Sequence, residues 1–150
     1  MAENLQGCEN SGMSMEFNVL IDRELLPDRE RWQAEIARSE LWTELGPDFD
    51  PGRSSGFQPM TFKGASTGFE FYLDEVNADD CPEGLVGYLP EHPRLAGFRF
   101  SGDLKELAAA LAASSTLASV SDGWFYDPQS ALVLDGPSAI DMARRELADM

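Results

Sequence analysis

The clearest alternation of apolar and polar positions begins at Leu95. In the stretch 95–100, Phe98 and Phe100 alternate with Gly97 and Arg99, which predicts a strand with both aromatic rings on one face. A face of this kind must be covered by another element if it is not to remain exposed to water. The residues that follow should therefore supply a cover.

A helix is predicted directly after that strand. Asp103 and Glu106 have the spacing of a capping box, in which both side chains satisfy backbone amides of the first helical turn. Leucine and alanine then recur on one helical face over 104–117, and the many alanines make that face thin enough to lie close against a sheet. Two short strands, over 123–128 and 131–136, are expected next.

The remaining elements follow from the same kinds of pattern. We predict a strand over 16–22, a helix over about 26–45, a Gly-, Pro- and Ser-rich connection over 48–67, a strand over 67–75, and a last helix that opens at 136–138. Leu20 departs from the alternation of the first strand, and Met60–Phe62 is left open as a short strand within the connection. In the strand over 67–75, Phe69 and Phe71 are predicted to point inward.

This element order predicts the fold class. The chain should be an α+β protein with an antiparallel sheet covered by helices, because its first six elements follow the β-α-β-β-α-β order of a ferredoxin-like fold. A C-terminal strand and helix are added to that order. With 150 residues and 43% hydrophobic residues, the chain has the size of a single domain. We assign that domain to 15–150 and interpret the polar residues 1–14 as a flexible tail.

The net charge of −16, from 27 acidic and 11 basic residues, disfavours several classes of partner. Nucleic-acid phosphates and anionic lipid heads are repelled by such a surface, so neither direct nucleic-acid binding nor membrane binding is expected. A basic protein would be attracted, although the same excess also serves solubility. The oligomeric state is left open.

Residues 1–15 lack Lys, Arg and an apolar run, which favours a cytoplasmic location. In that compartment Cys8 and Cys81 are expected to be reduced.

No stretch carries a specific catalytic or cofactor signature. Residues 64–68 spell G-x-S-x-G around Ser66, but a strand is predicted where a hydrolase needs a helix, and His92 is the sole histidine of the chain. Asp48 and Asp50 begin like a calcium loop that the following residues do not complete. We therefore predict a protein that is not an enzyme and has no cofactor and no dedicated metal, while a weakly held cation at Asp48 and Asp50, or at Asp79 and Asp80, is left open.

The best candidate for a functional surface is the acidic segment 64–93, which contains no Lys or Arg. Its strand should present an acidic outward face, and the polar residues after that strand extend the same charge. The candidate partner-binding residues are Glu70, Tyr72, Asp74, Glu75, Asp79, Asp80, Glu83 and Tyr88, in which the two tyrosines would be aromatic anchors.

Several short segments of the sequence together resemble those of a known group of proteins. They are Phe17–Ile21, Leu26–Pro27 with Trp32 following, Asp48–Asp50, Gly56–Pro59, Thr67–Phe71, Phe98–Asp103 and Asp127–Gln129. On these residues the chain, from about Met15 to its end, resembles small acidic bacterial proteins of unknown function that include immunity proteins of interbacterial (polymorphic) toxin systems. The resemblance implies a toxin inhibitor, and it supplies no catalytic residues. Members of such a group would be expected to differ over 77–93.

Three hypotheses follow. The first is a non-enzymatic binding protein that neutralises a basic toxin or effector by covering its active surface. The second is a phage or plasmid protein that mimics DNA and blocks a host nuclease or regulator. The third is a small enzyme with an unrecognised site, which would lose turnover on a change of Ser66 or His92 that leaves the fold intact. The identity of the partner, and whether the acidic segment is an interface or only a solvated surface, remain open at this point.

Overall fold

The structure, a computed structural model, describes residues 15–150, and the predicted tail over 1–14 lies outside them. Its strands are β1 (Met15–Asp22), β2 (Thr43–Leu45), β3 (Gly56–Phe62), β4 (Ala65–Glu75), β5 (Pro93–Phe100), β6 (Trp124–Asp127) and β7 (Leu132–Asp135). Its helices are α2 (Arg29–Arg38), α3 (Leu104–Val120) and α4 (Gly136–Leu147), with short 3-10 turns η1 (Arg23–Leu25) and η2 (Glu83–Tyr88).

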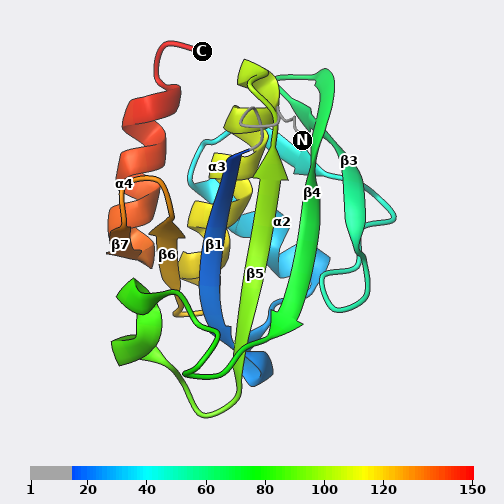
Figure 1. The fold of residues 1–150 in the computed structure, drawn as a ribbon. Coiled ribbons are helices and arrows are strands. Elements are labelled where there is room, and N and C mark those ends of the chain that lie inside the picture. The colour runs from blue at the N-terminus through cyan, green and yellow to red at the C-terminus, as the bar shows by residue number, and fades with distance from the viewer. Residues whose placement is uncertain (1–14) are drawn as a thin grey trace, which may run out of the picture.

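The seven strands form one antiparallel sheet in the order β2-β3-β4-β5-β1-β6-β7. β1 occupies an interior position between β5 and β6, although these partners come from the second half of the chain. Figure 1 shows α2 and α3 behind the sheet, with α4 beside them. An α+β protein with an antiparallel sheet covered by helices is therefore confirmed.

The main core lies between the sheet and α3. The aromatic faces predicted for the strands point into it, because Phe69, Phe71 and Phe98 are almost fully buried. Helix α3 begins as predicted, since the Asp103 carboxylate accepts hydrogen bonds from the amides of Lys105 and Glu106. It is buried on nearly every side, because it packs against α2 and α4 as well as the sheet.

Trp32 of α2 links the layers of the core. Its indole N–H lies 3.1 Å from both the carbonyl oxygen of Ala113 and the hydroxyl of Thr116, two residues of α3. Its ring makes edge contacts with three phenylalanines, Phe49, Phe71 and Phe98, at centroid distances of 5.5–6.0 Å. The side chain has no exposed area. Trp32 is therefore a packing residue rather than a binding anchor.

A second, smaller core lies on the opposite face of the sheet. Leu20, which departs from the alternation of β1, is buried there beside Leu85 of η2 and Tyr126 of β6. Val76 and Cys81 complete this cluster, and burial raises the pKa of the Cys81 thiol, which is free. The segment 76–90 therefore covers one end of the outer face.

Three predictions about the first half of the chain are wrong or incomplete. The helix predicted over 26–45 ends at Arg38, because Glu40 takes a left-handed conformation with φ of 59° and closes the helix. The residues after it form β2, in which Thr43 and Leu45 point inward. The connection predicted over 48–67 contains β3, a longer strand than Met60–Phe62. Because β2 and β3 precede β4, the ferredoxin-like order is not confirmed.

Candidate functional site

The uncovered end of the outer sheet face, which we call the open face, is the candidate functional site. The strand register aligns two rows of outward positions across β4, β5 and β1. These rows are Glu70, Arg99 and Glu16, and then Tyr72, Gly97 and Asn18. The predicted outward orientation of Glu70 and Tyr72 is thereby confirmed. The segment 76–90 covers only the other end, and here Arg99 is exposed and Glu16, Glu70 and Tyr72 are partly exposed, whereas Asn18 is buried.

The surface is hollowed where the open face meets the covering segment 76–90, because Val76 and Asp80 belong to the lining. A hollow of about 410 Å³ is lined by the carboxylates of Glu16, Asp74, Glu75 and Asp80, together with Tyr72 and the guanidinium of Arg99. Gly97 forms part of its floor, and a β-carbon there would lie 2.9 Å from a carboxylate oxygen of Glu16. Four acids and one base give the hollow a negative potential, which a cationic group would relieve.

Hydrogen bonds hold the polar groups of the open face in place. The Tyr72 hydroxyl donates to Oε1 of Glu70 at 2.6 Å, and this bond is the main reason why the pKa of Tyr72 is raised. The Asn18 amide donates to Oε2 of Glu16 at 2.7 Å, and Arg99 lies 3.5 Å from the other oxygen of Glu16. Each carboxylate keeps lone pairs for further donors, so the surface is organised before any partner arrives.

The structure groups the predicted site residues into two sets. Tyr72, Asp74, Glu75 and Asp80 line one hollow and Glu70 lies beside it, while Asp79 is exposed in the turn that follows β4. Two of these carboxylates also have partners within the fold. Glu75 pairs with Arg94 at 3.3 Å, and the Asp80 carboxylate accepts the amide of Asn77 at 2.7 Å.

Glu83 and Tyr88 form the second set, on η2. This turn contacts β6 and β7 rather than the open face, and the Tyr88 ring packs on Trp124 at a centroid distance of 4.2 Å. Tyr88 keeps 42% of its surface exposed. The two tyrosines predicted as anchors therefore belong to different parts of the surface.

Residues of the open face that the sequence analysis did not assign to the site are Glu16, Asn18, Gly97, Arg99 and Phe57. Phe57 of β3 pairs with Glu70 and is 58% exposed, with its ring over Gly68. The alternation of polar residues in the first strand places Glu16 and Asn18 on an outward face. The neighbours of that strand in the sheet are determined by pairing between distant parts of the chain, and the alternation of polar and apolar residues does not predict this pairing.

The motif residues lie apart from one another. Ser66 is near the start of β4, after the tight turn at Lys63 and Gly64, whereas His92 precedes β5 and lies 3.5 Å from Glu24. The β4–β5 register places His92 beyond the far end of β4, so the structure does not bring the two side chains together. Asp50 accepts the amide of Gly52 in its own loop. Over residues 15–150, no three potential metal-ligating side chains gather.

None of the helices over residues 15–150 combines the length and the apolar character needed to cross a membrane. Compared with protein-family models, with curated proteins and with solved structures, the chain finds no match in any of the three.

Proposed function

We propose that this chain is a binding protein whose open face engages a basic protein partner. The observation that carries the proposal is the hollow at the edge of the uncovered sheet, which Glu16, Asp74, Glu75 and Asp80 line together with Tyr72. An aromatic side chain at the centre of a charged patch is typical of an interaction hot spot. Binding rather than catalysis is proposed because the acidic groups of this face are spread over a solvent-exposed sheet, and no nucleophile and base among residues 15–150 are brought together there.

The electrostatics favour a cationic surface as the ligand. The chain carries a net charge of −16, and the hollow adds a local excess of carboxylates over guanidinium groups. Lysine and arginine side chains would be steered toward it at low ionic strength, whereas nucleic-acid phosphates would be repelled. Arg99 is held by Glu16, Asp74 has no partner among the described residues, and the carboxylates of Glu70, Glu75 and Asp80 keep lone pairs for a cationic partner beside the bonds they already accept.

The resemblance to immunity proteins supplies the partner class. We propose that the partner is a basic toxin or effector, and that this protein neutralises it by covering its active surface. A toxin that acts on nucleic acid must attract phosphate, so an acidic inhibitor can occupy the same groove and associate rapidly. Tyr72 would contact the partner near the hollow of the open face, and Phe57 would contact it at the rim.

The experiment is a pull-down from the native host with the tagged protein, first at low salt and then at 0.5 M salt, with mass spectrometry of the retained proteins. We expect one basic protein in near-equal amount, and loss of that protein's toxic activity in the presence of the bait. Its affinity for the chain is then measured at several salt concentrations.

Two matched triple variants locate the contact. Each removes three negative charges without changing side-chain size: the open-face variant is Glu70→Gln, Asp74→Asn and Glu75→Gln, and the control is Glu30→Gln, Asp141→Asn and Glu146→Gln. The control acids are exposed on α2 and α4. We expect the open-face variant to bind about tenfold more weakly at low salt and with a smaller salt dependence. Equal losses in both variants would make net charge, not the open face, the cause.

Two other results would contradict the proposal. Retention of many unrelated DNA-binding proteins, all displaced by added DNA, would indicate a DNA mimic instead. Turnover of a substrate that is lost on Ser66→Ala or His92→Gln, with the fold intact, would indicate an enzyme.

A further inference from the structure

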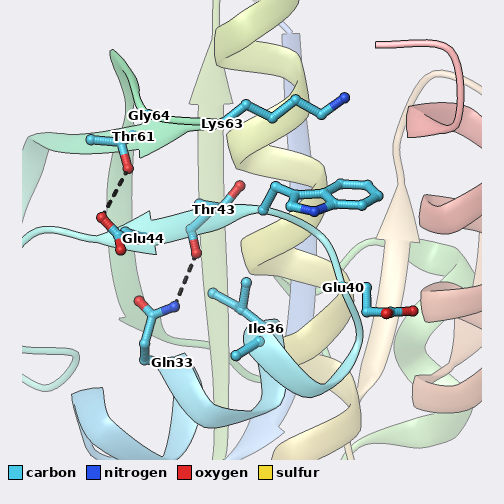
Figure 2. Close-up of a pocket in the computed structure, with 10 residues that line it drawn as sticks. Gln33, Ile36, Glu40, Thr43, Glu44, Thr61, Lys63 and Gly64 are labelled. Atoms are coloured by element: carbon cyan, nitrogen blue, oxygen red, sulfur yellow. Dashed lines mark hydrogen bonds between the residues drawn. The ribbon is translucent and has the colours of Figure 1, made fainter.

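A second hollow lies at the other edge of the sheet, between the end of α2, strand β2 and the turn that joins β3 to β4. Its volume is about 440 Å³. Figure 2 shows Lys63 extending along one side of this hollow and Glu40 on the opposite side, with Gln33, Thr43, Glu44 and Thr61 around it. It shares no lining residue with the open face, so the inference below does not rest on the proposed function.

Glu40 occupies a position where glycine would be favoured. It follows the last turn of α2 with φ of 59°, and its amide and that of Leu41 close the helix on the carbonyls of Ala37 and Ile36. This is the left-handed residue of a Schellman motif, for which glycine carries no steric cost. A glutamate there costs stability. Within residues 15–150, its carboxylate accepts no hydrogen bond and joins no ion pair.

Trp42, two residues later, is a second non-glycine residue with a left-handed backbone conformation. Its φ is 52°, which is a rare conformation for a bulky aromatic residue. Its side chain is nevertheless 53% exposed. The Lys63 ammonium lies 4.9 Å from the ring centroid and bonds to the carbonyl oxygen of Met150. The indole therefore already accepts a cation, and part of its surface remains open to a second group.

Most other polar groups of the hollow already have partners. Gln33 uses both ends of its amide on the backbone of β2, at 2.7 and 3.0 Å. Glu44 accepts the hydroxyl of Thr61 at 3.4 Å. Glu44 keeps its second carboxylate oxygen, but Glu40 is the carboxylate with no partner among residues 15–150. Glu40 and the exposed indole of Trp42 are therefore the principal groups left for a ligand. Both are held in place by a backbone conformation that reduces stability, a pattern found at binding sites.

We propose that the hollow between Glu40 and Trp42 binds a guanidinium group. A guanidinium is planar, so it can stack on the indole while its N–H groups donate to the carboxylate in a bidentate pair. An ammonium can pair with the carboxylate, but it is not planar and cannot also stack on the indole. An anion would meet the carboxylates of Glu40 and Glu44, while Lys63 is already bonded to Met150. Free arginine and an arginine side chain of a protein carry the same group.

The test follows the indole N–H signals of the three tryptophans in two-dimensional ¹H–¹⁵N spectra, with the Trp42 signal assigned from Trp42→Phe. The ligands are N-acetyl-arginine methylamide, free arginine, and N-acetyl-citrulline methylamide, whose side chain has nearly the same shape but no charge. We expect the arginine compounds to move the Trp42 signal saturably, and citrulline to leave it unchanged. The tighter of the two arginine compounds identifies the source, since the methylamide represents a protein side chain.

Two substitutions separate a binding role from a structural one. Glu40→Gln should weaken the arginine compounds about fivefold, and Glu40→Gly should abolish binding while raising the midpoint of thermal unfolding. Asp74→Asn on the open face should leave this titration unchanged, which separates it from the proposed function. An equal response to citrulline, an unmoved Trp42 signal, or unchanged affinity in Glu40→Gln would overturn the proposal.

Discussion

Replacing Trp32 by phenylalanine tests how the layers of this fold are held together. The fully buried indole donates its N–H to Ala113 and Thr116 of α3, at 3.1 Å in each case. Phenylalanine removes that donor, while the Thr116 hydroxyl keeps its own bond to Ala112. Losing the donor should cost about 1 kcal/mol. The smaller ring also leaves a cavity beside three phenylalanines, which adds about 1–2 kcal/mol.

The free energy of unfolding should therefore fall by about 2–3 kcal/mol, a large part of the 5–15 kcal/mol typical of a domain. For a chain of this length the thermal midpoint should drop by about 5–10 °C. Trp42→Phe makes the same chemical change at a side chain that is 53% exposed. Its cost should stay below about 0.5 kcal/mol.

Urea unfolding followed by far-ultraviolet circular dichroism is the suitable assay, because it does not depend on tryptophan fluorescence. Both variants should keep the wild-type dependence of free energy on urea, so that the midpoints can be compared directly. If Trp32→Phe and Trp42→Phe unfold at the same midpoint, the contacts of Trp32 with α3 do not stabilise the fold and our account of the core is wrong.

Four further outcomes are expected. Gly136→Ala should destabilise by about 1–3 kcal/mol in thermal unfolding, because its β-carbon would lie 2.4 Å from the backbone of α3, whereas Gly87→Ala, with open space, should be nearly neutral. Asp103→Ala should cost about 1 kcal/mol in urea unfolding, since it removes the N-cap of α3. The pKa of Asp135 is lowered, first by the hydrogen bond that its carboxylate accepts from a backbone amide of α4. Its contribution to the free energy of unfolding should therefore be present above about pH 4 and be lost as the pH falls through the lowered folded-state pKa. Asp135→Asn should flatten that acidic limb of the curve of stability against pH. The raised pKa of Tyr72 should appear in ultraviolet titration as a tyrosine that ionises above about pH 10, and Tyr72→Phe should remove it.

The elements that pattern alone could predict are those with one buried face and a local start signal. The strand that ends at Phe100 and helix α3 are examples, because the alternation of Phe98 and Phe100 and the spacing of Asp103 and Glu106 lie within a few residues. In physical terms, a two-residue period and a capping box each require only local backbone geometry.

The end of α2 could not be predicted in the same way. Leu41 and Leu45 are four residues apart, which fits a helical face, and both are buried. They are equally inward-facing positions of an extended segment, so their spacing does not distinguish the two structures. The deciding residue is Glu40, whose left-handed conformation closes the helix. Since glycine is the usual signal for such an end, a glutamate conceals it.

The candidate site could be predicted only in part. The acidic outward face of β4 follows from alternation, but its neighbours Glu16 and Arg99 come from strands that join it through pairing between distant parts of the chain. Leu20 gave a partial signal, because an apolar residue on the polar side of a strand requires a second cover. The pattern does not identify which segment supplies it, and the structure assigns 76–90.

The boundary between the covered and open parts of the outer face follows from charge. At Leu20 an apolar cover gains free energy by removing hydrocarbon from water. Two and four residues earlier in β1 stand Asn18 and Glu16, and a cover there would have to dehydrate a carboxylate at a cost of several kcal/mol unless it brought a cation. The segment 76–90 contains no Lys or Arg, so it cannot extend over these residues without that cost. A partner that supplies the cation can cover them, which is why the same carboxylates that keep the intramolecular cover short would favour a basic protein.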